Sequence, residues 1–194
     1  MGSGIRIAIE EINTRNVRDV SKCEGEFIIN AKLVLQVEND EIRYSITEVP
    51  STKKRYGKDN VDYTAYIDDQ DKAVFLAYVE GQIAGHIILR KNWNIYAYIE
   101  DIAVDVKFRR WGIGKELISQ AKRWAQDRNL AGIMLETQNN NVRACKFYES
   151  CSFQLRGYDT YLYKGINNDT DEIALYWYLV FEEAPPNQRI QPTA

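Results

Sequence analysis

The sequence predicts an α/β domain built on a mixed, mostly antiparallel central sheet that is flanked by helices. Short runs of alternating apolar and polar residues predict strands, and two segments with apolar residues three and four positions apart predict amphipathic helices. Their order, hairpins first and then strand–helix–strand–helix–strand–strand, allows one or two parallel crossovers. We expect one domain over residues 1–181, followed by a Glu-, Pro- and Gln-rich tail at 182–194 that is poorly ordered or non-native.

The first third of the chain is expected to contain strands and one short helix. Alternating residues predict strands at 5–9, 32–37 and 43–49. The last two would form a hairpin, because Asn39 and Asp40 suit a tight turn. A short helix is expected at 14–21 with Thr14 as its N-cap. The charged stretch 50–62 is expected to be a loop.

The rest of the chain carries a stronger pattern. Further strands are expected at 74–79, 82–91, 96–105, 133–137, 153–163 and 172–181. A long amphipathic helix is expected at 113–128, because its apolar residues recur at the spacing of a buried stripe. A second helix is expected at Val142–Ser150, where the preceding asparagines at 139–141 offer N-caps.

Composition and charge exclude several classes of protein. The 194 residues are 45% hydrophobic and 27% charged, which is typical of a globular chain and not of a disordered one. No apolar run approaches the roughly 20 residues that cross a bilayer, and no apolar stretch follows the N-terminus, so we expect a cytoplasmic protein without a membrane partner. The net charge of −3 argues against a nucleic-acid partner.

Cysteine and histidine usage narrows the chemistry further. The three cysteines are an odd number without C-x-x-C spacing, so neither a disulfide framework nor a zinc site is indicated. His86 is the single histidine, which excludes a multi-histidine metal centre, and we expect no metal. We read His86 as a strand residue near the core.

The clearest local signal is the segment 109–115, R-R-W-G-I-G-K, which lies between a predicted strand and the long helix. Glycines at 112 and 114 allow a ligand to approach the backbone, and the first turn of a helix offers unpaired N–H groups. Together these features suit a pyrophosphate, with basic side chains close by. On its own the pattern is also compatible with a tight turn and solvated basic residues.

Three elements in order resemble the GNAT superfamily of N-acetyltransferases. They are I-E-D-I-A-V at 99–104, the R-x-x-G-x-G loop at 109–114, and N-V-R-A-C-K-F-Y at 141–148 with Phe153 after it. Ser152 departs from the glycine that is usual in the family. The resemblance implies an acetyl-CoA-dependent enzyme whose co-substrate contacts the matching residues Ile102, Ala103, Val104, Arg109, Arg110, Trp111, Gly112, Ile113, Gly114, Lys115, Asn141 and Ala144.

A closer similarity is to the streptothricin acetyltransferases. It rests on Trp93-Asn94, on Y-I-E-D-I-A-V at 98–104, on L-E-T-Q-N-N-N at 135–141, and on the late Y-W-Y at 176–178. This similarity implies acetylation of a primary amine on the β-lysine arm of the antibiotic, and hence antibiotic resistance.

An alkyl ammonium must lose a proton before it can attack a thioester, because its pKa lies near that of lysine, about 10.4. We expect Glu100 to be the base, on the strand face shared with Ile102 and Val104, and we expect Asp101 to face the other way. Tyr148 matches the family tyrosine that protonates the departing thiolate. A backbone N–H near Val104 would hold the oxyanion. The expected reaction is direct transfer without an acyl-enzyme.

A small cationic acceptor requires carboxylates and aromatic faces. The candidates in this sequence are Trp93, Tyr98, Glu136, Asp159 and Trp177. Three alternatives stay open: another small amine as acceptor, a peptide lysine as acceptor, and a catalytically silent sensor that binds acyl-CoA. The sequence also leaves a homodimer open.

Overall fold

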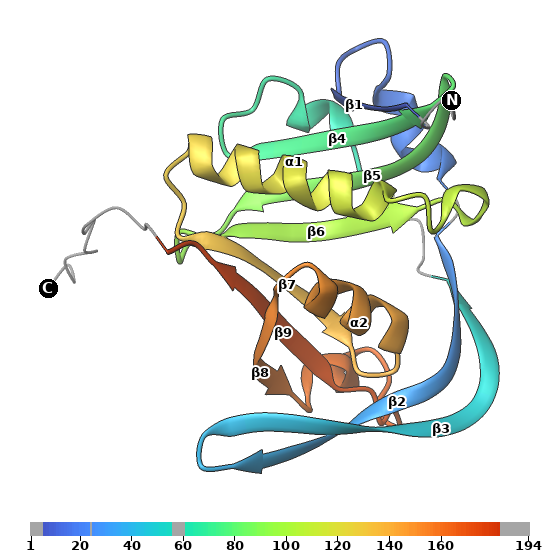
Figure 1. Ribbon diagram of the computed structural model, residues 1–194, viewed down its shortest axis with the longest axis vertical. Helices are drawn as coiled ribbons and strands as arrows, with labels where there is room; N and C mark the ends of the chain where they lie inside the picture. The colour runs from blue at the N-terminus through green and yellow to red at the C-terminus, as the bar shows by residue number, and fades with distance from the viewer. Residues whose placement is uncertain (1–5, 24, 56–60, 183–194) are drawn as a thin grey trace, which may run out of the picture.

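The computed structural model describes residues 6–23, 25–55 and 61–182. Within them, seven strands form one sheet in the order β1-β4-β5-β6-β7-β9-β8 (Figure 1). All neighbours are antiparallel except the parallel pair β6–β7, as the expected mixed sheet requires. The strands are β1 (Ile7–Glu11), β4 (Lys72–Val79), β5 (Gln82–Lys91), β6 (Ala97–Val104), β7 (Gly132–Gln138), β8 (Gln154–Asp159) and β9 (Ala174–Val180).

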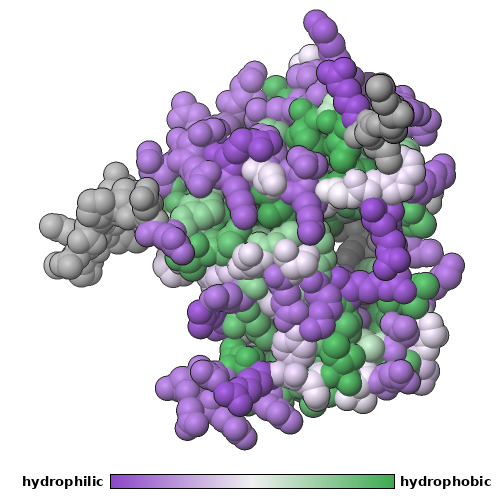
Figure 2. Space-filling view, viewed as in Figure 1, coloured by the Kyte–Doolittle hydropathy of each residue, from purple (hydrophilic) through white to green (hydrophobic). Residues whose placement is uncertain are grey.

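Helices α1 (Ile113–Asp127) and α2 (Val142–Ser150) lie on the same side of this sheet (Figure 1). The buried stripe of α1 runs through Leu117, Ala121 and Trp124 and packs in the main core cluster. Figure 2 shows hydrophilic side chains over the outward side of α1, as its amphipathic pattern predicts. We call this side, which carries Phe75, Ile87 and Leu89 of the sheet, the helix face.

The other side of the sheet has a smaller core of its own. Because side chains alternate along a strand, Val74, Leu76 and Ile88 point away from the helices. They pack under two 3-10 helices, η1 (Val17–Lys22) and η2 (Tyr63–Tyr66). We call this side the opposite face. No helix in the part of the chain that the structure describes is long and apolar enough to span a bilayer.

A long hairpin of β2 (Glu26–Glu38) and β3 (Glu41–Arg55) curves around the half of the molecule that holds β8 and α2 (Figure 1). Its turn is the expected one, with positive φ angles at Asn39 (51°) and Asp40 (63°). The hairpin is tied to the domain by the amide of Leu33, which donates to the carbonyl of Asn139 (2.9 Å).

Three expectations about local structure were wrong. The loop expected at 50–62 is strand as far as Arg55, because β3 keeps pairing with β2, and residues 56–60 lie outside the described ones. The helix expected at 14–21 is a 3-10 helix at Val17–Lys22, and its N-cap residue is Asn16 instead of Thr14. The Asn16 side chain makes no cap hydrogen bond to the helix, and its Oδ1 accepts from the amide of Asn13 (2.7 Å).

The third error concerns the strand expected at 153–163. β8 ends at Asp159, because this carboxylate accepts from the amides of Tyr161 (2.6 Å) and Leu162 (3.1 Å) and turns the chain into η4 (Leu162–Gly165). The strand expected at 32–37 is also longer than expected and begins at Glu26, while the remaining expected elements agree with the structure to within two residues at each end. Nearly all of the expected tail, residues 183–194, lies outside the described residues.

Candidate active site

A cleft of about 1870 Å³ opens where β6 and β7 stop pairing. Their parallel ladder covers only Ala97–Ile99 against Ile133–Leu135, and beyond it both strands continue unpaired with each other. The residues that follow, 100–104 on β6 and 136–138 on β7, line the cleft. Its volume exceeds the 300–1,000 Å³ of a typical small-molecule pocket, so it has room for a large co-substrate and a second molecule.

The start of α1 forms one wall of the cleft on the helix face. Gly112 has the left-handed φ of 86°, provides no side-chain cap, and accepts from the amide of Lys115 (2.9 Å). The amides that precede Lys115 in the first turn are therefore available to an anion. Figure 2 shows a hollow between the start of α1 and α2.

Close packing of α1 against α2 narrows this wall. A Cβ added at Gly114 would lie 2.9 Å from Cζ of Phe147, so a side chain larger than hydrogen forces the ring to move. Both residues line the cleft. The glycine at 114 is thus required by the approach of the two helices rather than by a positive φ.

The structure brings almost all of the expected co-substrate residues to the cleft. Those that line it are Ile102, Ala103, Val104, Arg109, Arg110, Gly112, Ile113, Gly114, Lys115, Asn141 and Ala144. Trp111 is the exception, because its ring packs edge-on against Phe108 (centroids 5.5 Å apart). Asn141 is also the N-cap of α2, where its Oδ1 accepts from the amide of Ala144 (3.3 Å).

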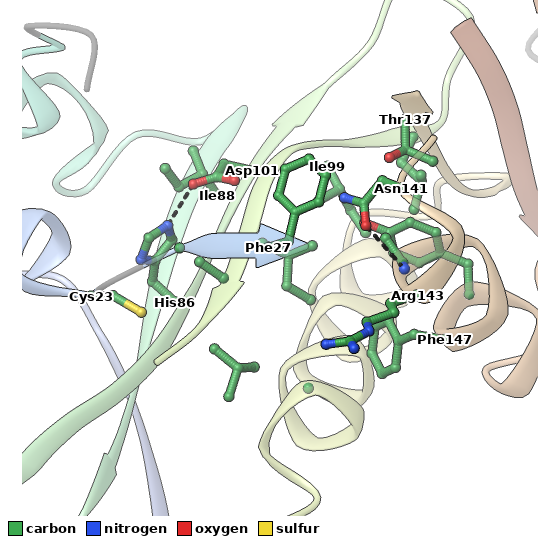
Figure 3. A pocket seen from close by; sticks show the side chains of 18 of the residues that line it. Cys23, Phe27, His86, Ile88, Ile99, Asp101, Thr137, Asn141, Arg143 and Phe147 are labelled. Carbon is green, nitrogen blue, oxygen red and sulfur yellow. Dashed lines mark hydrogen bonds and ion pairs between the residues drawn. The ribbon is translucent and has the colours of Figure 1, made fainter. Parts of the chain in front are cut away.

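Arg109 has a different role from the expected neutralisation of phosphate charge. Its guanidinium donates to the carbonyl of Val104 (3.2 Å) and to the carbonyl of Glu26. It therefore ties the end of β6 to the start of β2. The other basic side chains on the helix-face side of the cleft are Arg110 and Lys115 near the start of α1 and Arg143 and Lys146 of α2. The β2 segment that it holds also supplies Phe27, which lies between the two sides of the cleft in Figure 3.

Tyr148 reaches the cleft from the core. Only 6% of this residue is exposed, and its ring packs against Phe153 (5.8 Å) and Trp177 (6.4 Å). Trp177 itself is 1% exposed, so the expectation that its face would meet an acceptor is wrong: it is a core residue.

A β-bulge in β6 overturns the expected orientation of Glu100, whereas Asp101 faces away from Ile102 and Val104 as expected. Ile88 pairs with Asp101 and Leu89 pairs with Ile99, so Glu100 is an extra residue without a partner on β5. Both carboxylates consequently lie on the opposite face, while Ile102 and Val104 pack with the helix-face core. Strict alternation along the strand had placed Glu100 with Ile102 and separated it from Asp101.

The carboxylate of Glu100 is fully engaged. Oε1 pairs with Nε of Arg90 (3.0 Å), and Oε2 accepts from the hydroxyl of Tyr66 on η2 (2.7 Å). Burial and the bond to Glu100 raise the pKa of Tyr66, so this phenol stays protonated as a donor.

Asp101 pairs with the buried His86. Nε2 of His86 lies 2.7 Å from Oδ2 of Asp101, and the imidazole side chain is 8% exposed against 49% for the carboxylate. Figure 3 shows this pair on one side of the cleft, with Asn141 and Phe147 of α2 on the other. The expected position of His86, in a strand near the core, is confirmed.

Glu136 lies directly after Leu135, the last residue of β7 that pairs with β6. It is half-buried, and its Oε1 accepts from the hydroxyl of Tyr163 on η4. Burial raises the pKa of Glu136, although the bond from Tyr163 acts against that rise. Within the described ranges, no Lys or Arg nitrogen lies within 4 Å of this carboxylate.

The other residues expected to meet an acceptor do not line the cleft. Trp93 is 81% exposed, Asp159 caps η4, and the ring of Tyr98 is covered by the guanidinium of Arg90 at 4.6 Å. The residues on the opposite face that sequence reasoning missed are Tyr66 and Tyr163, and His86 and Asp101, to which it gave no role in the site, line the cleft as well. No local pattern could have identified the two tyrosines, because their partners lie 34 and 27 residues away.

Comparisons with known proteins agree with this geometry. Residues 38–153 match the acetyltransferase (GNAT) family. The chain is 38% identical to streptothricin acetyltransferase A of Bacillus subtilis (strain 168) over 169 residues, which are 86% of this chain and 95% of that protein.

Two solved structures share the fold over nearly their whole length. A protein from Bacillus anthracis str. Ames, assigned as a streptothricin acetyltransferase and crystallised with acetyl coenzyme A, is 46% identical with a TM-score of 0.85; the match covers 93% of this chain and all of that one. A nourseothricin acetyltransferase is 26% identical with a TM-score of 0.76, over 92% and 99% of the two chains. The family match spans more than half of the sequence, and we conclude that this chain belongs to the GNAT family of acetyltransferases.

Proposed function

We propose that this protein transfers the acetyl group of acetyl-CoA to a primary amine of a streptothricin-type antibiotic and so confers resistance. The observation that carries the proposal is the course of the cleft. It runs from the free amides at the start of α1, between the diverging strands β6 and β7, to carboxylates on the opposite face. Two substrates could thus enter from the two faces and meet between the strands.

The helix-face wall fits the diphosphate and pantetheine of the co-substrate. Helix N-termini with glycine before them bind phosphate through their amides and their dipole. The edge of β6 at 102–104 faces away from β5 and no longer pairs with β7, so it can bond to pantetheine as a strand would. The acetyl complex of the B. anthracis relative supports the same co-substrate here.

The opposite-face wall fits a cationic acceptor. Glu100, Asp101 and Glu136 line it together with tyrosine rings from η2 and η4. Carboxylates and aromatic faces are the groups that bind ammonium ions. The names of the curated and solved relatives point to streptothricin or nourseothricin as the acceptor.

The reaction needs two proton transfers, one to the departing thiolate and one from the amine, and we assign them to residues on different faces of the sheet. Tyr148, which reaches the cleft from α2, is placed to protonate the departing thiolate. A backbone N–H near Val104 would stabilise the developing oxyanion. The amine proton goes to a carboxylate of the opposite face, for which the sequence predicts Glu100. Transfer is direct, and no acyl-enzyme is needed.

Thiol release measures this function directly. We expect free thiol when the protein is mixed with acetyl-CoA and streptothricin, and much slower release with an aminoglycoside, a polyamine or a lysine peptide. A preference for the peptide would identify a peptide N-acetyltransferase instead. Binding of acetyl-CoA in calorimetry without thiol release from any amine would identify a silent sensor, and the absence of both would refute the proposal.

A further inference from the structure

We propose that Glu136, and not Glu100, accepts the proton of the acceptor amine, with Tyr163 as its positioning residue. This inference rests on the proposed function and deepens it. It assigns the base to the one cleft carboxylate of β7, on the strand across the gap from β6, and it leaves Glu100 as a structural anion.

The position of Glu136 favours this role. Ile133 and Leu135 point into the helix-face core, so Glu136 points to the opposite face by alternation along β7. It follows the last β6–β7 pair directly, and it therefore stands at the narrow end of the gap between the strands. An amine that enters from the opposite face passes this carboxylate as it reaches the gap.

The partners of the three carboxylates distinguish them. A general base needs an oxygen that is free to take a proton, and an adjacent cation weakens it by favouring the ionised form. Both oxygens of Glu100 are occupied, one by Arg90, whereas Asp101 has one oxygen bonded to His86 and its side chain is 49% exposed. Glu136 has a phenol on Oε1 and, among the residues that the structure covers, no cation within 4 Å.

The electrostatic surroundings of Glu136 also favour it as the base. Burial raises the pKa of Glu136 toward the range in which a base works best near neutral pH. The groups around it are Tyr98 of β6, Tyr163 of η4, Tyr176 of β9 and the ion pair between Lys54 and Glu172. Lys54 is the single cation among them, and Glu172 neutralises it.

Tyr163 orients the base through a chain of contacts. Asp159 caps the turn that starts η4, η4 presents Tyr163, and the Tyr163 hydroxyl donates to Oε1. This bond leaves Oε2 for the amine. Asp159 was expected to touch the acceptor, and in this scheme it acts two steps away.

The protons balance as follows. Glu136 takes one proton from the ammonium, the nitrogen then forms the new C–N bond, and Glu136 later releases its proton to solvent. A second proton leaves the nitrogen as the C–S bond breaks, while Tyr148 protonates the thiolate and recovers that second proton. The products are the amide, free coenzyme A and one proton.

A pair of matched variants, Glu136→Gln and Glu100→Gln, tests the assignment by steady-state kinetics with acetyl-CoA and streptothricin. We expect Glu136→Gln to lower kcat by about 10²–10⁴-fold, with unchanged acetyl-CoA binding, and Glu100→Gln to lower kcat by less than about ten-fold because it contributes no proton transfer. Glu10→Gln, an exposed glutamate on β1, is the control for the substitution itself.

The opposite ranking of the two variants would overturn the inference. So would a Glu136→Gln protein whose KM rises while kcat stays that of the unmodified chain, because Glu136 would then bind the acceptor without taking its proton. These outcomes require that the unmodified chain releases thiol. If it does not, the proposed function fails, and the inference fails with it.

The pH profile separates a positioning role of Tyr163 from a merely structural one. The bond from Tyr163 lowers the pKa of Glu136, so Tyr163→Phe should raise that pKa and move the acidic limb of kcat/KM to higher pH. The Glu136→Gln variant has no carboxylate to titrate at this position, so the pH profile of its residual kcat/KM should lack the acidic limb. An acidic limb that stays in place in both variants would contradict the assignment.

Discussion

The two faces of the sheet build their halves of the cleft from different material. On the helix face the ligand groups are mainly backbone: amides at the start of α1, the free edge of β6, and glycines that let ligand and helix approach. On the opposite face they are side chains from β5, β6, β7, η2 and η4, held by bonds between distant residues. A backbone site requires only a local conformation, whereas a side-chain site requires the correct register of several strands.

The largest effect expected on the helix face comes from the one side chain there to which we assign chemistry. Tyr148→Phe keeps the buried ring between Phe153 and Trp177 and removes the hydroxyl. We expect kcat to fall by about 10²–10³-fold while acetyl-CoA affinity is retained, because a general acid acts in the transition state. Tyr158→Phe on β8, where the tyrosine is 44% exposed, is the matched control. An unchanged kcat would show that the helix face contributes binding alone.

The backbone character of the helix-face site is tested by Gly114→Val. The new side chain meets the ring of Phe147 at 2.9 Å and pushes α2 away from the start of α1. We expect acetyl-CoA to bind about 100-fold more weakly in calorimetry, close to 3 kcal/mol. Gly157→Ala is the control, because a Cβ there makes only ordinary contacts, at 3.6 Å or more. Unchanged affinity in Gly114→Val would mean that the approach of the two helices does not shape the site.

The faces also differ in how far the sequence predicts them. The strand–loop–helix order and the glycines at 112 and 114 are local, and eleven of the twelve residues that the family resemblance implied for the co-substrate line the cleft. The orientation of Glu100 was wrong, because a single extra residue in β6 breaks the alternation on which it depended. Trp177 was wrong because an aromatic residue in a strand looks the same in sequence whether its ring is buried or exposed.

Arg109 ties the end of β6 to the start of β2, and its removal should affect stability. Its guanidinium holds the carbonyls of Val104 and Glu26, and hydrogen bonds from a charged group contribute more than neutral ones. We expect Arg109→Ala to lower the free energy of unfolding by about 2 kcal/mol in urea titrations. Arg110→Ala, whose side chain is exposed, should change stability by less than about 0.5 kcal/mol. If both variants lost the same free energy of unfolding, the two carbonyl bonds would not explain the role of Arg109. The expected role in phosphate binding would then be the better explanation.

The smallest expected effect is a gain in stability, and it concerns Glu136 on the opposite face of the sheet. The pKa of Glu136 is raised in the folded protein, so the folded state binds this proton more tightly than the unfolded state does. The resulting stability is fully present below the pKa of the unfolded chain, and it is lost as the pH rises through the folded pKa. At neutral pH, therefore, the ionised carboxylate costs stability.

Glu136→Gln should accordingly stabilise the protein while it lowers activity. The glutamine keeps the volume and can still accept from Tyr163, but it carries no charge into the partly buried site. Because the site is only partly buried, we expect a gain of no more than about 1 kcal/mol at pH 7 in urea titrations. The gain should vanish as the pH falls below the pKa of an unfolded glutamate, where both states are protonated. Glu100→Gln loses its ion pair to Arg90 and should show no gain at any pH. A Glu136→Gln protein that is less stable at pH 7 would mean that a cation outside the described residues neutralises Glu136, and the physical reason for choosing it as the base would be lost.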